Sequence, residues 1–94
     1  MSVTRINKFM AADGKVQELI VNFKFIVEYI KSSEGNISCE MMISSDDKNE
    51  IVILEVWESI EDHKKSLEKF PKEKMSPIMN LIIGAPTGNY YTKI

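Results

Sequence analysis

The sequence has one cysteine, Cys39, and one histidine, His63, among its 94 residues. A single cysteine excludes a disulfide within the chain, and the two residues together fall short of the ligands that a structural zinc site needs. Hydrophobic runs long enough to cross a bilayer are absent as well. The N-terminus also lacks the charged and then apolar pattern of a signal peptide, so we expect a cytoplasmic protein in a reducing compartment.

Neither sign of charge dominates, since 12 Lys and Arg residues stand against 14 Asp and Glu residues. A chain without a basic footprint is not expected to bind nucleic acid or a membrane surface. The four glycines do not form a phosphate-binding loop, and no calcium or other metal motif is present. With 44% hydrophobic and 28% charged residues, the composition is that of an ordinary globular protein, and the length predicts a single domain over residues 1–94.

The most informative segment runs from Glu50 to Glu61, where an apolar strand leads directly into a helix. Because successive side chains of a strand alternate between its faces, the odd-numbered residues from Ile51 to Trp57 share one side. The even-numbered residues from Val52 to Glu58 share the other side, which is also largely apolar. The helices of so small a domain can cover only one face of a sheet, so the second face predicts contact with another sheet or another subunit.

Helical periodicity is clearest between Lys15 and Ser32, where apolar residues recur at steps of three and four. Asp13 is a suitable N-cap for this helix, and Gly35 is expected to end it. A second helix is expected after the N-cap Ser59. Its apolar stripe is interpreted as Ile60, His63, Leu67 and Phe70. A short helix from Pro77 to Ile83 follows, with four candidates for burial, namely Met75, Ile78, Met79 and Ile82.

Three further segments are expected to be strands. Val3 to Ala11 and the tail from Gly88 to Ile94 have mixed polarity, whereas Asn36 to Ser45 alternates and has one apolar face. The polar cluster at residues 46–49 has a length suited to a hairpin between the second and third strands. Cys39 lies on the apolar side of its strand and should be an inert core thiol.

The order of elements is strand, helix, strand, strand, one or two helices, strand. This order predicts an α+β fold, the ferredoxin-like split β-α-β sandwich, with helices on one face of the sheet. The uncovered apolar face would be an unusually large exposed patch for a monomer. We therefore expect a homodimer that packs through this sheet face.

The segment from Leu54 to Glu61 (LEVWESIE), with a long amphipathic helix before it and an acidic helix start after it, resembles the antibiotic biosynthesis monooxygenase (ABM) domain. Glu34-Gly35-Asn36 is similar to the step by which members of that family begin their second strand. The resemblance spans nearly the whole chain and implies a dimeric α/β barrel. It also implies a group that includes cofactor-independent oxygenases of phenols or quinols and haem-degrading relatives.

Cofactor-free oxygenation requires a substrate that can be deprotonated to an electron-rich anion, which then passes an electron to O₂. Glu55 could accept that proton if burial raises its pKa, or it could instead pair with Arg5, Lys8 or a neighbouring subunit. Trp57, on the same face of the strand, could stack on an aromatic substrate or simply fill the core.

Ser66 stands where many members of the family have a pocket-facing histidine on the second helix, so the resemblance places Ser66 at the binding site. His63, one turn earlier, could replace that histidine as a proton donor or acceptor, or could only top the apolar stripe of its helix. Arg5 and Asn7 share one side of the first strand and could donate hydrogen bonds to an oxyanion or to oxygen. Tyr29 could line the edge of the pocket with its hydroxyl toward solvent, or be a half-exposed aromatic.

We therefore interpret the chain as an enzyme, a monooxygenase (oxidoreductase) that needs no cofactor and acts on a small aromatic or quinol-like compound. The expected catalytic residues are Glu55, Trp57, His63 and Asn7. The expected substrate-binding residues are Arg5, Tyr29 and Ser66. The alternative is a non-catalytic small-molecule-binding or stress-related dimeric module of the same fold, and haem binding is a third possibility.

Overall fold

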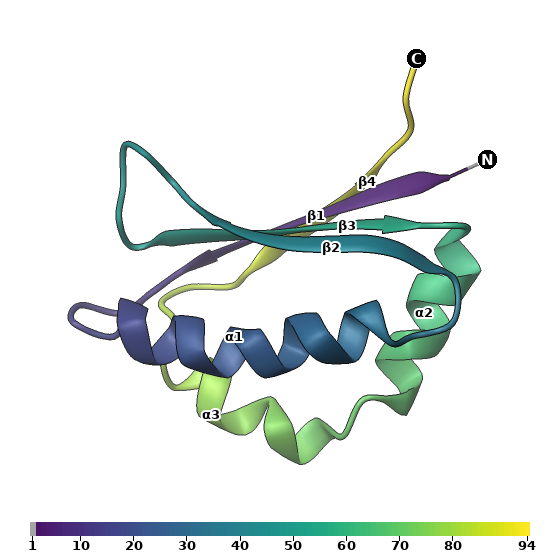
Figure 1. Ribbon diagram of the computed structural model, residues 1–94. Helices are drawn as coiled ribbons and strands as arrows, with labels where there is room; N and C mark the ends of the chain where they lie inside the picture. The colour runs from purple at the N-terminus through teal and green to yellow at the C-terminus, as the bar shows by residue number, and fades with distance from the viewer. Residues whose placement is uncertain (1) are drawn as a thin grey trace.

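The computed structural model describes residues 2–94 as a four-stranded sheet with helices packed against it (Figure 1). The elements are β1 (Val3–Met10), α1 (Val16–Lys31), β2 (Asn36–Ile43), β3 (Glu50–Trp57), α2 (Ile60–Lys69), the 3₁₀ turn η1 (Lys72–Lys74), α3 (Ser76–Met79) and β4 (Thr87–Tyr91). The strand order is β2-β3-β1-β4, and every neighbouring pair is antiparallel. The fold is the α+β ferredoxin-like arrangement predicted from the sequence.

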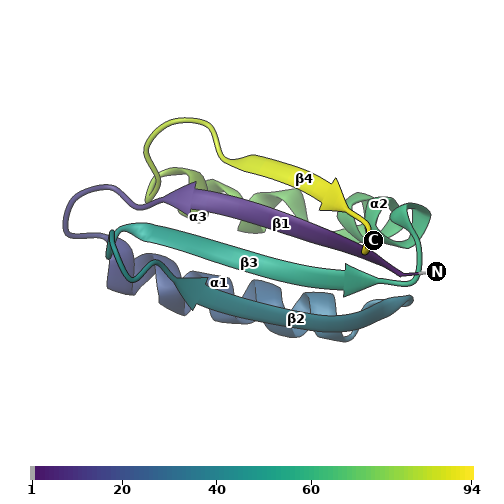
Figure 2. The same cartoon turned by 90° about the horizontal axis from the view of Figure 1, so that it is seen from above.

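The helices all lie on one face of the sheet. Figure 1 shows α1, α2 and α3 on the same side, and Figure 2 shows the opposite face with no described element over it. Along β3 the burial alternates as predicted, because the odd-numbered residues are buried and the even-numbered residues are half-buried. The central strand therefore has two apolar faces, of which the chain itself covers one.

The uncovered face is apolar near the middle of the sheet. The strand register places Ile6 of β1 next to Leu54 of β3, and Met42 of β2 next to Val52. Met42 and Tyr91 each remain at least two fifths exposed. This strip is the part of the sheet that the sequence assigns to a second subunit.

The long helix is confirmed almost residue for residue, since α1 buries Leu19, Phe23, Val27 and Ile30 against the sheet. The prediction that Asp13 caps it is wrong. The N-cap is Lys15, with no side-chain hydrogen bond, because Gly14 takes a positive φ of 74° and makes a turn between Asp13 and the helix. Gly35 also lies beyond the end of α1, and its carbonyl accepts a hydrogen bond of 2.8 Å from the N–H of Glu58.

The second helix begins as predicted, because Ser59 Oγ accepts a hydrogen bond of 3.1 Å from the N–H of Asp62. Its predicted stripe is confirmed at His63 and wrong at Ile60 and Leu67. The buried residues are His63 and Ser66, whereas Leu67 is 57% exposed and Ile60 is 40% exposed. Residues three apart lie on one row of a helix, and the row that faces the sheet carries the two polar residues while the apolar ones fall on its flanks.

The predicted helix from Pro77 to Ile83 is shorter than expected. Ile78 is buried and Met75 and Ile82 pack against the core, but Met79 is half-exposed and Leu81 is buried in its place. The reason is that the chain leaves the helix after Met79 and forms a bridge from Ile82 to Ala11, which changes the phase of the buried side chains.

Candidate active site

A cavity of about 140 Å³ lies between the sheet and the helices α1 and α2. Most of its wall is apolar and is formed by Phe9, Phe23, Ile26, Ile30, Ile53 and Phe70. Polar side chains interrupt this wall as well, among them Arg5, Asn7, Glu55 and His63. Since a dry cavity of about 150 Å³ can hold benzene, the space matches one small ring.

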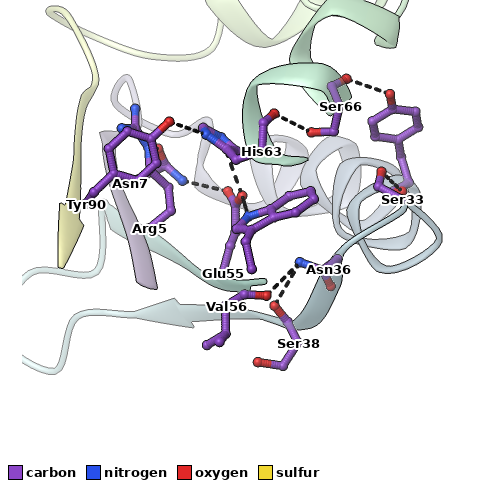
Figure 3. A network of polar contacts seen from close by, with 12 residues as sticks. Arg5, Asn7, Ser33, Asn36, Ser38, Glu55, Val56, His63, Ser66 and Tyr90 are labelled. Atoms are coloured by element: carbon purple, nitrogen blue, oxygen red, sulfur yellow. Dashed lines mark hydrogen bonds and ion pairs between the residues drawn. The ribbon is translucent and has the colours of Figure 1, made fainter. Parts of the chain in front are cut away.

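The sheet register brings three of these polar residues together. β1 and β3 pair so that Arg5 lies opposite Glu55, and Asn7 lies opposite Ile53. All three polar residues occupy odd-numbered positions, and side chains two apart on a strand share a face. Figure 3 shows them converging beneath α2. The side of β1 that faces the helices is therefore the side predicted to carry the hydrogen-bond donors.

The hydrogen bonds among these residues have a fixed direction. Arg5 Nε donates to Asn7 Oδ1 at 3.1 Å, and Asn7 Nδ2 donates to Glu55 Oε2 at 2.7 Å. An arginine has no acceptor, so the oxygen of the Asn7 amide must face Arg5 and its NH₂ group must face Glu55. Trp57 Nε1 donates to Glu55 Oε1 at 2.8 Å. Both carboxylate oxygens therefore accept a hydrogen bond from a neutral N–H group.

His63 joins this network from α2. Its Nε2 lies 3.7 Å from Glu55 Oε1, and its Nδ1 lies 2.6 Å from the hydroxyl of Tyr90 on β4. The guanidinium of Arg5 stacks over the Tyr90 ring, with its carbon 4.6 Å from the ring centre. The imidazole is thus held between a carboxylate on the central strand and a phenol on the edge strand (Figure 3).

Burial changes the protonation of both members of this pair. Burial raises the pKa of the Glu55 carboxyl above its ordinary value, and hydrogen bonds from Trp57 and Asn7 and the charge of Arg5 oppose that rise only in part. Burial also lowers the pKa of His63 to about 4, helped by the positive charges of Arg5 and Lys64. At neutral pH the imidazole is therefore uncharged, and the carboxylate is a stronger base than a carboxylate in water.

Tyr29 and Ser66, which were expected to bind substrate together with Arg5, line the same cavity. The hydroxyl of Tyr29 donates a hydrogen bond of 2.7 Å to the carbonyl of Ser66 on α2, in a half-buried position. The hydroxyl of Ser66 donates to the carbonyl of His63 at 2.9 Å. Both hydroxyl protons are therefore already used within the protein.

Trp57 is completely buried and lies behind Glu55, away from the cavity wall. Its ring centre is 5.4 Å from that of His63. Of the seven residues predicted for the site, the other six line the cavity. The arrangement gives Trp57 a part in holding the carboxylate, whereas stacking on a substrate would need a face that the ring does not offer.

Tyr90 belongs to this network but was missed among the predicted site residues. The sequence places Gly88 and Tyr90 on the same side of the last strand, yet it does not show which strand lies beside it. The structure pairs Asn7 with Gly88 and Arg5 with Tyr90. A Cβ atom on Gly88 would collide with the Arg5 and Asn7 side chains, so the missing side chain makes room for both.

Residues 2–94 also bear on two other features, a metal site and a membrane-spanning helix. No group of three or more His, Cys, Asp and Glu side chains in this range is arranged to hold a metal ion. None of the helices formed by these residues is long and apolar enough to span a membrane.

The fold and the network together define a ferredoxin-like α+β domain with a buried acid–base pair at an apolar cavity. The family model described as antibiotic biosynthesis monooxygenase matches residues 2–69. The chain therefore belongs to the ABM family, as its resemblance indicated. No curated protein matches the sequence.

Solved structures with the same fold cover almost the entire chain. SnoaB, a cofactor-independent oxygenase from Streptomyces nogalater, is 18% identical with a TM-score of 0.84, over 99% of this chain and 93% of SnoaB. A candidate antibiotic biosynthesis monooxygenase from Chloroflexus aurantiacus is 27% identical with a TM-score of 0.80, over 100% of this chain and 94% of that one. A conserved protein from Methanosarcina mazei is 19% identical with a TM-score of 0.91, over 100% and 94%.

Proposed function

We propose that this protein is a cofactor-independent monooxygenase that oxidises a small phenol or quinol. The observation that carries the proposal is the buried pair Glu55 and His63 on the wall of an otherwise apolar cavity of about 140 Å³. Membership of the ABM family supports it, and so does the likeness in fold to SnoaB, which is described as a cofactor-independent oxygenase.

The chemistry begins with the hydroxyl proton of the substrate, which passes to the pair formed by Glu55 and His63. The resulting anion gives one electron to O₂, and the substrate radical and superoxide then combine at a ring carbon that carries hydrogen. The hydroperoxide formed loses water and leaves a carbonyl group. One O₂ is consumed for each phenol, with one oxygen atom in the quinone product and the other in water.

The apolar wall and the donors serve different parts of this reaction. Phe23, Ile53 and Phe70 exclude water and receive the ring. Arg5 and Asn7 supply N–H groups near the Glu55 carboxylate. There they stabilise the negative charge that forms during proton transfer. Binding pockets for drug-sized ligands usually span about 300–1,000 Å³, so a substrate larger than one ring would extend beyond this cavity of about 140 Å³.

The test is oxygen uptake by the purified protein with no added metal or flavin, using phenols and quinols of one, two and three rings. We expect uptake with single-ring substrates that falls at least about tenfold in Glu55→Gln, since positioned proton transfer contributes about 10²–10⁴-fold. Val21→Ala on α1, where the side chain is 55% exposed, is the control and should keep the wild-type rate. Uptake that is unchanged in Glu55→Gln would overturn the proposal.

A second candidate function is a non-catalytic module that binds a small aromatic molecule. The position of Ser66 favours it, because the hydroxyl at the site of the family's usual histidine is bonded within its own helix. This function predicts that ring compounds bind, as seen by quenching of Trp57 fluorescence or by calorimetry, without any oxygen uptake across the panel.

We further propose that the protein works as a homodimer through the uncovered sheet face. Support comes from the half-buried residues Val52, Leu54 and Val56 on that face and from the exposed Met42 and Tyr91 beside them. Two copies that pack together through this face would remove its apolar surface from water, and this burial would stabilise the dimer.

A further inference from the structure

We propose that Tyr90 is a positioning residue that holds His63 as a neutral hydrogen-bond donor, so that Glu55 takes the substrate proton and His63 stabilises the negative oxygen that remains. The catalytic half of this inference rests on the proposed function. The arrangement of protons on His63 is a property of the protein without substrate, and it can be tested separately.

The direction of the hydrogen bonds around Glu55 leads to this assignment. Trp57 and Asn7 both donate to the carboxylate, one to each oxygen, and an ionised Glu55 satisfies both bonds. His63 Nε2 faces Oε1, the oxygen that also accepts from Trp57, at 3.7 Å. An unprotonated Nε2 would set two acceptors against each other, so the proton of the neutral imidazole belongs on Nε2.

This tautomer determines the direction of the hydrogen bond between Tyr90 and His63. With the proton on Nε2, Nδ1 carries a lone pair and can only accept a hydrogen bond. The Tyr90 hydroxyl, 2.6 Å away, must therefore donate to Nδ1. The opposite arrangement, with the proton on Nδ1 and Tyr90 as acceptor, would turn the Nε2 lone pair toward Oε1, which an ionised Glu55 disfavours and a protonated Glu55 tolerates. The tautomer of His63 and the charge of Glu55 are thus coupled through Tyr90.

The two positive charges near His63 favour the neutral imidazole of the first arrangement, whereas the ionised Glu55 carboxylate opposes them. Arg5 approaches from β1 and Lys64 from α2 itself, and both positive charges disfavour a charged imidazole. Glu55 approaches from β3 and Tyr90 from β4. From α1, Tyr29 lines the same cavity, and its hydroxyl donates to the Ser66 carbonyl. Arg5 stabilises an ionised Glu55 through Asn7, which keeps Nε2 as the donor.

A neutral imidazole donor suits the proposed reaction. An N–H group that already points at the site stabilises a developing oxyanion without a proton of its own having to move. It also leaves the carboxylate as the acceptor for the substrate proton, so the two residues do not compete for it. His63 is then the donor and Glu55 the base of the pair.

The first experiment is nitrogen NMR of ¹⁵N-labelled protein at neutral pH, which is unambiguous because His63 is the one histidine among 94 residues. We expect Nε2 to be protonated and Nδ1 to be unprotonated and hydrogen-bonded. In Tyr90→Phe the Nδ1 resonance should move, and the ratio of the two tautomers should shift about fivefold, as the loss of one hydrogen bond requires. Tyr91→Phe should match wild type. A protonated Nδ1 in wild type, or an Nδ1 resonance unchanged in Tyr90→Phe, would overturn the inference.

The second experiment separates a donor from a base by oxygen uptake. The Gln side chain can donate a hydrogen bond but cannot accept a catalytic proton, so His63→Gln should retain at least about tenfold more activity than His63→Ala. Tyr90→Phe should lower kcat while leaving KM nearly unchanged. Equal loss in His63→Gln and His63→Ala would show His63 to be the base. Absence of uptake in wild type would count against the proposed function, whereas the tautomer would still be decided by NMR.

Discussion

The indole Nε1 of Trp57 donates a hydrogen bond of 2.8 Å to Oε1 of Glu55, two residues earlier on the same strand. Side chains two apart on a strand lie on the same face, so β3 alone brings the donor and the carboxylate together. Because Trp57 is fully buried, its N–H has no access to water and depends on this bond. The tryptophan thus orients the carboxylate toward His63, and its full burial agrees with the alternative that it fills the core.

The direction of the hydrogen bonds around Glu55 predicts what happens when the Glu55 acid and the Asn7 amide are exchanged. Glu55→Gln presents one NH₂ group and one oxygen to two donors, so one donor loses its acceptor. Adding Asn7→Asp restores every bond, because the new carboxylate accepts from both Arg5 and the new amide. We expect a favourable coupling energy of about 2 kcal/mol in a double-mutant cycle, measured by urea unfolding. Additive effects of the two changes would contradict the direction of these bonds.

The lowered pKa of His63, at about 4, predicts an acid-sensitive fold. The unfolded chain takes up a proton at the ordinary histidine pKa of 6.5, whereas the folded protein resists it, so stability is lost as the pH falls from 6.5 toward 4. Between pH 7 and pH 4, wild type should lose about 3 kcal/mol more of its unfolding free energy than His63→Gln.

The measurement is urea unfolding of both proteins at each pH, followed by Trp57 fluorescence. Glu55 acts in the opposite direction, because a raised carboxyl pKa makes stability fall as the pH rises through it. Both proteins keep Glu55, so that contribution is common to the comparison. Equal losses in the two proteins would mean that His63 binds protons as readily in the folded state as in the unfolded state.

Gly88→Ala tests how the edge strand supports the site. The added Cβ would fall on the side chains of Arg5 and Asn7 and displace both. We expect a loss of about 1–2 kcal/mol in unfolding free energy and a further rise in the pKa of Glu55, because the bond from Asn7 is lost. Asn89→Ala, at an exposed neighbour on the same strand, is the control and should have little effect. A variant that keeps wild-type stability and Glu55 titration would show that the two side chains have other positions open to them.

Leu54→Lys tests the proposed dimer. A lysine at this half-buried position of the uncovered face would place a charge in the interface, so we expect a monomer in sedimentation velocity where wild type is a dimer. Val21→Lys makes the same kind of change on α1, where the side chain is 55% exposed, and should leave the dimer intact. A monomeric wild type at tens of micromolar would refute the predicted assembly.

Cys39 should resist thiol reagents in the folded protein. The side chain is buried, and burial together with the nearby Glu55 charge raises its pKa from 9.0 to about 12. The thiolate is therefore roughly 1,000-fold scarcer than at the ordinary pKa. We expect no modification by a chromogenic disulfide reagent at pH 8 over hours, and rapid modification in urea. Rapid reaction without urea would show that β2 opens locally.

The sequence predicted most of the fold because the apolar residues of most segments recur with the regular spacing of a helix or a strand. The three- and four-residue steps from Val16 to Ile30 predicted α1 closely, and the two-sided strand at Glu50–Trp57 predicted that the helices cover only one apolar face of β3. Prediction failed where a tertiary contact decided which side chains of a segment face the core. In α2 the row toward the sheet carries His63 and Ser66, and after Met79 the bridge from Ile82 to Ala11 replaced the predicted helical turns.

The sequence by itself determined which residues share a face, because alternation along a strand is a local property of the backbone. Arg5 with Asn7 and Glu55 with Trp57 are pairs of this kind. Only the tertiary structure decided which strands lie side by side, and hence that Tyr90 of the last strand reaches His63 and that Gly88 leaves room for Arg5 and Asn7. The reason is physical, since strand order and register follow from burying all the apolar faces at once, and no single segment contains that information.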